Sequence, residues 1–123
     1  MNTRRKILII AAAVTMFPGL VRAQSVAVSS KVATSGGEKN DLLVRFNETG
    51  LAPGQSVSYV ITGNANCGSG PASTVGTAFT LTATRSGGIK QSIYVEEPAD
   101  CIGAAHFSNM LFCDQDDSLC VNF

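Results

Sequence analysis

The sequence predicts an all-β fold, a small immunoglobulin-like β-sandwich of about seven strands stapled by disulfides. Three observations predict it. Apolar and polar residues alternate with period two over several short runs, and Gly and Pro fall between those runs. No 3.6-residue periodicity follows Ala23. Four cysteines in a short chain without tryptophan supply the covalent support that a modest core needs.

The first 23 residues have the pattern of a cleavable signal peptide. A basic start precedes an apolar run over 7–17, and Val21 and Ala23 are residues that signal peptidase accepts. This run is shorter than the roughly 20 residues that a membrane-spanning helix needs. We therefore expect cleavage between Ala23 and Gln24, no stable membrane insertion after signal removal, and a single exported domain over residues 24–123.

The start Thr3-Arg4-Arg5-Lys6 also fits the twin-arginine export signal, which would carry the domain across the membrane already folded. An ordinary secretory signal explains the same basic residues. Either route predicts a secreted or periplasmic protein, and both favour a bacterial source.

Cleavage would change the charge balance. The full chain has 9 basic and 9 acidic residues, and four basic residues leave with the signal, so 5 basic and 9 acidic residues remain and the net charge is −4. No run of Lys or Arg remains to drive nucleic-acid binding by counterion release. We therefore expect no nucleic acid among the partners and no basic amphipathic helix for anionic lipid.

Strand patterning extends through the mature chain. Period-two alternation places one set of side chains on a core face and the other in water, and β-branched residues are enriched in the same runs. The alternating runs are 26–28, 42–47, 56–62, 79–84 and 92–96.

Turn residues separate the runs. Gly supplies the positive φ that tight turns need, and Pro fixes φ at the second turn position. The runs 79–84 and 89–96 are separated by Arg85-Ser86-Gly87-Gly88, so we expect them to form a β-hairpin.

The four cysteines predict two disulfides, for which three connectivities are possible. We favour one bridge from the end of the Tyr59 strand to the segment after Pro98, and a second across the turn between the last two strands. Zinc binding would need close pairs such as C-x-x-C, whereas the gaps are 34, 12 and 7 residues, so no metal or other cofactor is expected. The favoured pairs are Cys67–Cys101 and Cys113–Cys120.

Acidic residues are concentrated near the C-terminal end of the chain. Asp114, Asp116 and Asp117 offer oxygen ligands to calcium, but Leu119 stands where a calcium loop has glycine and no glutamate closes the loop. The expectation is a solvated polar turn between the last two cysteines, with calcium binding as the alternative.

Catalytic patterns are missing from the sequence. His106 is the only histidine, and we expect it to lie half-buried in a strand without a chemical duty. The chain has no G-x-S-x-G, no H-E-x-x-H and no phosphate-binding glycine loop. Oxidised cysteines would leave no thiol nucleophile. We therefore expect no catalytic residue and no enzyme.

One segment resembles a pattern found in small secreted bacterial proteins of unknown function. Residues 44–59 read V-x-F-x-E-T-G-L-x-P-G-x-x-V-x-Y, and Cys67 with Gly70-Pro71, 87–89 and 107–110 are similar as well. The resemblance implies an exported β-domain and no particular activity. Cys113 and Cys120 are not part of the pattern, so the second bridge is predicted from spacing alone.

The leading functional hypothesis is a non-enzymatic exported binding or structural module, because loops on a rigid sandwich commonly carry recognition. Its partner would be an unknown protein or surface ligand. One alternative is a secreted protein inhibitor that uses the stapled loop as a pre-organised contact. The other is a calcium-dependent binding domain or small hydrolase that uses the turn 114–117.

Overall fold

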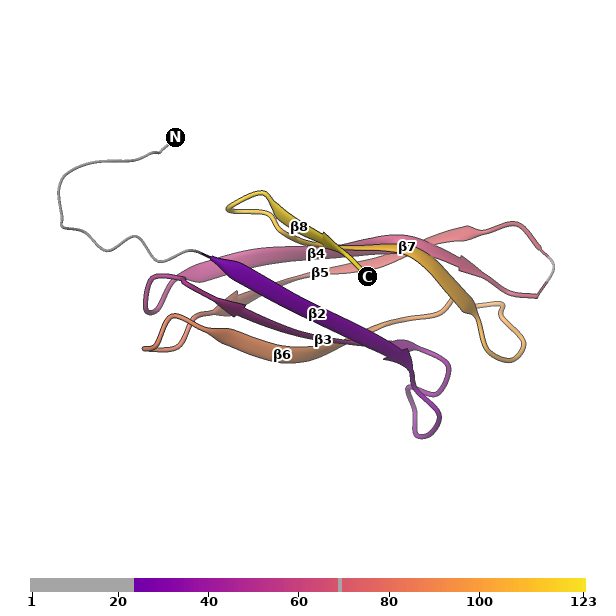
Figure 1. The fold of residues 1–123 in the computed structure, drawn as a ribbon. Helices are drawn as coiled ribbons and strands as arrows, with labels where there is room; N and C mark the ends of the chain where they lie inside the picture. Colours follow the sequence, from indigo (N-terminus) through magenta and orange to yellow (C-terminus); the bar gives the residue numbers. More distant parts are fainter. Residues whose placement is uncertain (1–23, 69) are drawn as a thin grey trace, which may run out of the picture.

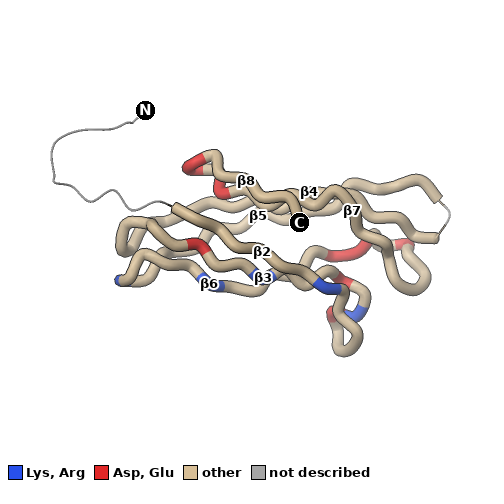
Figure 2. The backbone as a smooth tube through the Cα atoms, in the orientation of Figure 1, with Lys and Arg blue, Asp and Glu red and all other residues tan. Residues whose placement is uncertain are grey.

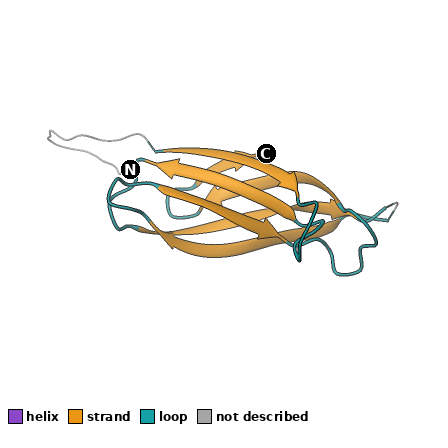
Figure 3. Cartoon of the chain, turned by 90° about the horizontal axis from the view of Figure 1, so that it is seen from below, coloured by secondary structure: helices purple, strands orange, loops and turns teal. Residues whose placement is uncertain are grey.

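The structure is a computed structural model that describes residues 24–68 and 70–123. The predicted signal peptide, Met1 to Ala23, lies outside the described residues, and its cleavage stays a prediction. The described residues form strands and loops only, as Figure 3 shows. None of their segments is a helix long and apolar enough to cross a membrane.

Two antiparallel sheets stack face to face (Figure 1). One sheet has three strands in the order β2-β3-β6, and the other has four in the order β5-β4-β7-β8. The strands are β2 (Ser25–Val32), β3 (Leu42–Thr49), β4 (Ser56–Asn66), β5 (Ser73–Thr82), β6 (Ile89–Val95), β7 (His106–Asp114) and β8 (Leu119–Asn122).

The connectivity is immunoglobulin-like. Constant-type immunoglobulin domains place the first, second, fourth and fifth strands in one sheet and the third, sixth and seventh in the other. Here the fourth strand, β5, pairs with β4 and so belongs to the second sheet. The predicted small, disulfide-stapled β-sandwich is confirmed.

Aromatic rings join the two sheets. Phe46 of β3 and Phe112 of β7 lie 4.6 Å apart between ring centroids, and Tyr59 of β4 lies 5.1 Å from Phe46 and 5.3 Å from Phe112. Antibody domains have a disulfide between the second and sixth strands, packed against a tryptophan of the third. Phenylalanines on the same two strands take that place here, and the tyrosine of the third strand packs against both.

The predicted hairpin over 79–84 and 89–96 is wrong. β5 pairs with β4 and begins at Ser73, well before the predicted run, whereas β6 pairs with β3 in the other sheet. The turn is tight as expected, because Thr84 N–H donates to the Gly88 carbonyl at 2.9 Å. It carries the chain from one sheet to the other. Alternation and turn residues are the same for a hairpin and for such a crossing.

Gly87 docks this crossing turn onto the loop after β3. Its carbonyl accepts a hydrogen bond from Leu51 N–H at 3.0 Å, and its φ is 79°, in the left-handed region. A Cβ at this position would collide with the Leu51 carbonyl oxygen. Only glycine therefore fits both the turn and the close approach.

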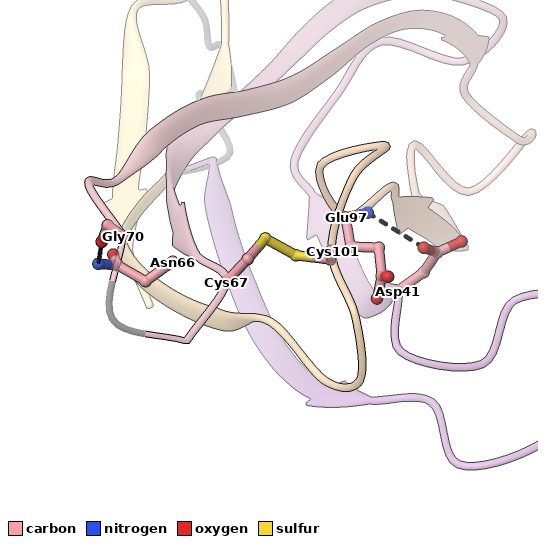
Figure 4. Close-up of a disulfide and its surroundings, with 6 residues drawn as sticks. All are labelled: Asp41, Asn66, Cys67, Gly70, Glu97 and Cys101. Atoms are coloured by element: carbon pink, nitrogen blue, oxygen red, sulfur yellow. Dashed lines mark hydrogen bonds between the residues drawn. A yellow bond between two sulfur atoms is a disulfide. The ribbon is translucent and has the colours of Figure 1, made fainter.

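Both favoured disulfides are present. Cys67 follows β4 and is bonded to Cys101 in the loop before β7, with Cα atoms 5.1 Å apart, as Figure 4 shows. Cys113 and Cys120 are bonded directly across the β7–β8 ladder, with Cα atoms 4.1 Å apart. The first bridge ties the long loop between β6 and β7 to the end of β4, and the second staples the last hairpin.

Removing the first bridge is expected to destabilise the domain more than removing the second. A bridge over a separation of 34 residues restricts the unfolded chain more than one over 7, and the chain-entropy model gives losses of about 4 and about 2.5 kcal/mol. Urea unfolding of Cys67→Ala/Cys101→Ala and Cys113→Ala/Cys120→Ala beside the wild type measures both losses. A larger loss for the second pair would contradict the expectation.

Candidate functional site

Three cations lie in a row on the outer face of the three-stranded sheet. Lys31 of β2, Arg45 of β3 and Lys90 of β6 are all exposed, and Figure 2 shows a blue segment in each of these strands. Arg45 pairs with Ser29 on one side and with Ser92 on the other. Lys31 is two residues beyond Ser29 and Lys90 two before Ser92, so the cations follow a diagonal with Cα spacings of about 7–8 Å. We call Lys31, Arg45 and Lys90 the basic row.

Strand alternation fixes the direction of these side chains. On β3, Val44 and Phe46 are buried in the core, so Arg45 between them points outward and is exposed. Glu48 has the same parity as Phe46 and points inward. One strand thus places its cation in solvent and its carboxyl group in the core.

Two adjoining depressions follow the basic row, and both are lined by Arg45 and Ser29. The larger, of about 350 Å³, includes Lys90, and the smaller, of about 100 Å³, includes Lys31. Both are shallow and open. The remaining residues that line the larger depression are Ala27, Phe46, Asn47, Gln91 and Ser92.

Within the described chain, no cation of the basic row has an ion-pair partner, and the outward positions of β2, β3 and β6 carry no carboxylate. The exposed acidic residues lie in loops, where most of the red segments of Figure 2 are seen. The tertiary structure therefore gathers positive charge that is scattered in the sequence. Arginine and lysine side chains in this setting can hold an anion by charge and hydrogen bonds.

A second group of ionisable residues lies inside the sandwich. Glu48, Tyr59 and Asp114 are each 0% exposed. The Tyr59 hydroxyl donates to Oε1 of Glu48 at 2.6 Å. Asp114 pairs with Tyr59 in the β4–β7 ladder, and its Oδ1 accepts the N–H groups of Asp116 at 3.0 Å and Asp117 at 3.3 Å.

Burial raises the pKa of the Glu48 carboxyl to about 7. The hydrogen bond and the charge of Asp114 act in the same direction, whereas the Tyr59 hydrogen bond lowers this pKa. Burial and the neighbouring carboxyl groups also raise the pKa of Tyr59. Oε2 of Glu48 and Oδ2 of Asp114 are buried acceptors without a donor in the described chain, so a proton on Glu48 provides the donor that the two carboxyl groups need.

The predicted solvated turn between the last cysteines is wrong for Asp114, which ends β7 inside the core. Asp116 and Asp117 are exposed, but Asp116 accepts the Ser58 N–H at 3.1 Å and Asp117 accepts Nε2 of Gln24 at 2.7 Å. The carboxylates proposed for calcium therefore bond to different parts of the protein. The residues that the structure describes include no group of three or more His, Cys, Asp or Glu side chains placed to hold a metal ion.

His106 begins β7, as expected of a strand residue, and pairs with Asn66 at the end of β4. Its side chain is exposed, so the expected half-burial is wrong. It lies at the sheet end that carries the Cys67–Cys101 bridge, away from Asp114 at the other end of β7.

Sequence reasoning missed both the basic row and the buried carboxyl pair. The pair left a signal, because Glu48 continues the inward parity of Val44 and Phe46, and Asp114 continues that of Phe112. The basic row left none, since its members come from strands that are far apart in the chain.

Comparisons with protein-family models, curated proteins and solved structures found no match to this chain. The resemblance to small secreted bacterial proteins therefore stays a prediction.

Replacing Glu48 with Gln is expected to remove most of the pH dependence of stability between about pH 4.5 and 7. Since the folded-state pKa of about 7 lies above the ordinary 4.5, the folded state binds the proton more tightly and stability falls as pH rises through this window. The difference between the folded-state pKa and the ordinary pKa of Glu48 corresponds to a change of about 3 kcal/mol in the free energy of unfolding across this window. The amide still accepts from Tyr59 and donates to Asp114 without titrating.

Urea unfolding at pH 5 and pH 8 measures this effect. The matched control is Glu38→Gln, which removes an exposed loop glutamate. Glu48→Gln should lose little stability at pH 5 and exceed the wild type at pH 8. Equal pH dependence in Glu48→Gln and the wild type would show that Glu48 does not hold the proton.

Proposed function

We propose that the mature chain is an exported, non-enzymatic binding module that holds an acidic polysaccharide on the outer face of the three-stranded sheet. The observation that carries the proposal is the basic row, three exposed cations without an ion-pair partner in the described chain. Such cations attract an anion even though the mature domain is expected to have a negative net charge, because charges farther than about 10 Å are screened by salt.

The spacing of the basic row favours an extended ligand. Two steps of about 7–8 Å between Cα atoms make the row about 15 Å long, which suits a ligand that extends along all three cations. A chain with repeated carboxylates is such a ligand. The guanidinium group of Arg45, at the centre, matches carboxylate geometry with two parallel N–H donors.

The other side chains of this face suit a sugar chain. Ser29, Ser92 and Asn47 supply hydroxyl and amide groups that both donate and accept hydrogen bonds, as sugar hydroxyls require. Tyr94 is 41% exposed and lies opposite Leu43 at the Lys31 end of the row. Its ring offers an apolar surface with a polar tip to a sugar ring.

Export is supported by two disulfides, which persist in oxidising compartments, and by the signal predicted at Met1 to Ala23. Acidic polysaccharides outside the cytoplasm are then accessible to the domain. The proposal therefore places the protein in the periplasm or outside the cell.

Arg45→Ala is expected to weaken binding of polygalacturonate about tenfold, because a charge-assisted hydrogen bond contributes about 1.5 kcal/mol or more. Isothermal titration calorimetry with the mature protein at two salt concentrations measures the loss. The matched control is Arg85→Ala, which removes the same charge from the crossing turn and should bind like the wild type.

Three outcomes would reject the proposal. Equal weakening by Arg85→Ala would show that only overall charge matters. Unchanged binding by Arg45→Ala would move the site elsewhere. Absence of binding to polygalacturonate, or tighter binding to double-stranded DNA than to it, would exclude acidic polysaccharide as the ligand.

A further inference from the structure

We infer that β5 is a pairing edge through which two copies of this chain form an antiparallel dimer with one continuous sheet. β5 is the outermost strand of the four-stranded sheet and pairs with β4 alone. Ten consecutive residue pairs, from Ser56–Thr82 to Ala65–Ser73, form this ladder without a bulge. The backbone groups on its other side bond to no other segment of the described chain, so they remain a straight template for another strand.

The other three edges of the sandwich are protected against such pairing. β2 carries Lys31, β6 carries Lys90, and β8 is only 4 residues long. Charges and short length are the usual devices that prevent edge pairing. β5 has 10 residues and no charge, no proline and no bulge. Among the edge strands of this domain, β5 therefore differs from β2, β6 and β8 in having no feature that prevents pairing with another strand.

The side chains of β5 also leave room for a partner. Its outward positions hold small residues, among them Gly76, Ala78 and Thr80. On the inward side, Phe79 and Leu81 pack on the core but are only partly buried. A strand added at this edge would cover the exposed parts of both, which adds apolar burial to the new backbone hydrogen bonds.

A second copy of β5 fits this edge. In an antiparallel pair, residues opposite each other share a face, so the two-fold axis must pass midway between the two copies of one residue. An axis at Ala78 places Gly76 opposite Thr80 and Thr77 opposite Phe79 on the partner, each a small residue against a larger one. Every pair is uncharged, so like strands do not repel. Two-fold dimers are the commonest protein oligomers.

The dimer would also arrange the basic rows, an extension that rests on the proposed function. The two-fold axis runs perpendicular to the joined sheet, so both three-stranded sheets lie on the same side of it. Two basic rows would then face one polymer, and simultaneous contact raises the overall affinity without new contacts.

Sedimentation velocity of the mature, oxidised protein without any ligand tests the dimer. The wild type should be dimeric at about 100 µM, and Ala78→Lys should raise the dimer dissociation constant at least about tenfold, since it places two like charges opposite each other. Thr80→Lys is the second variant and should act in the same direction. Circular dichroism and the melting temperature confirm that each variant folds.

The matched control is Thr62→Lys. Thr62 is exposed on the outer face of β4, one strand in from the edge, and pairs with Gly76. This variant should stay dimeric. A monomeric wild type at this concentration, or folded Ala78→Lys and Thr80→Lys proteins that both dimerise as the wild type does, would overturn the inference. Loss of the dimer in Thr62→Lys would indicate stacking of sheet faces in place of edge pairing. None of these results depends on the polysaccharide, so failure of the dimer and failure of the proposed function are separate outcomes.

Discussion

The contact between Phe46 and Phe112 across the two sheets is the interaction on which the rest of the structure depends. It joins the second and sixth strands, and Tyr59 of the third strand packs against both rings. Aromatic pairs at such distances add to the free energy gained from burial alone. A chain of this size buries a modest core, so these rings, which join the two sheets, and two disulfides provide much of the stability of the domain.

Tyr59 connects that core to the buried carboxyl groups. Its ring belongs to the aromatic cluster, and its hydroxyl donates to Glu48. Burying a carboxyl group is costly unless it is neutral or hydrogen-bonded. The proton on Glu48, the tyrosine hydroxyl and the N–H groups bonded to Asp114 meet that need together. The domain therefore contains a buried carboxyl group, that of Glu48, whose protonation is linked to folding.

Charged residues are distributed unevenly among the faces and edges of the sandwich. The outer face of the three-stranded sheet carries the basic row, whereas β4, β5 and β8 contain no charged residue. The lysines of β2 and β6 serve two purposes, because they contribute to the proposed binding face and discourage pairing at those edges. β5 is left without such a residue. The proposed ligand binding and the proposed self-association therefore involve different surfaces of one small domain.

The sequence by itself determined the all-β class and most of the strands, because alternation is a local signal. It favoured both disulfide pairs among three possible connectivities, and the structure contains that pairing. It did not determine that β5 and β6 lie in different sheets, since a crossing turn and a hairpin turn use the same residues. The inward parity of Glu48 and of Asp114 was present in the sequence, but the acidic residues that follow Asp114 gave it the pattern of a polar turn. Only the tertiary structure brought Lys31, Arg45 and Lys90 together, because strand pairing places residues side by side that are far apart along the chain.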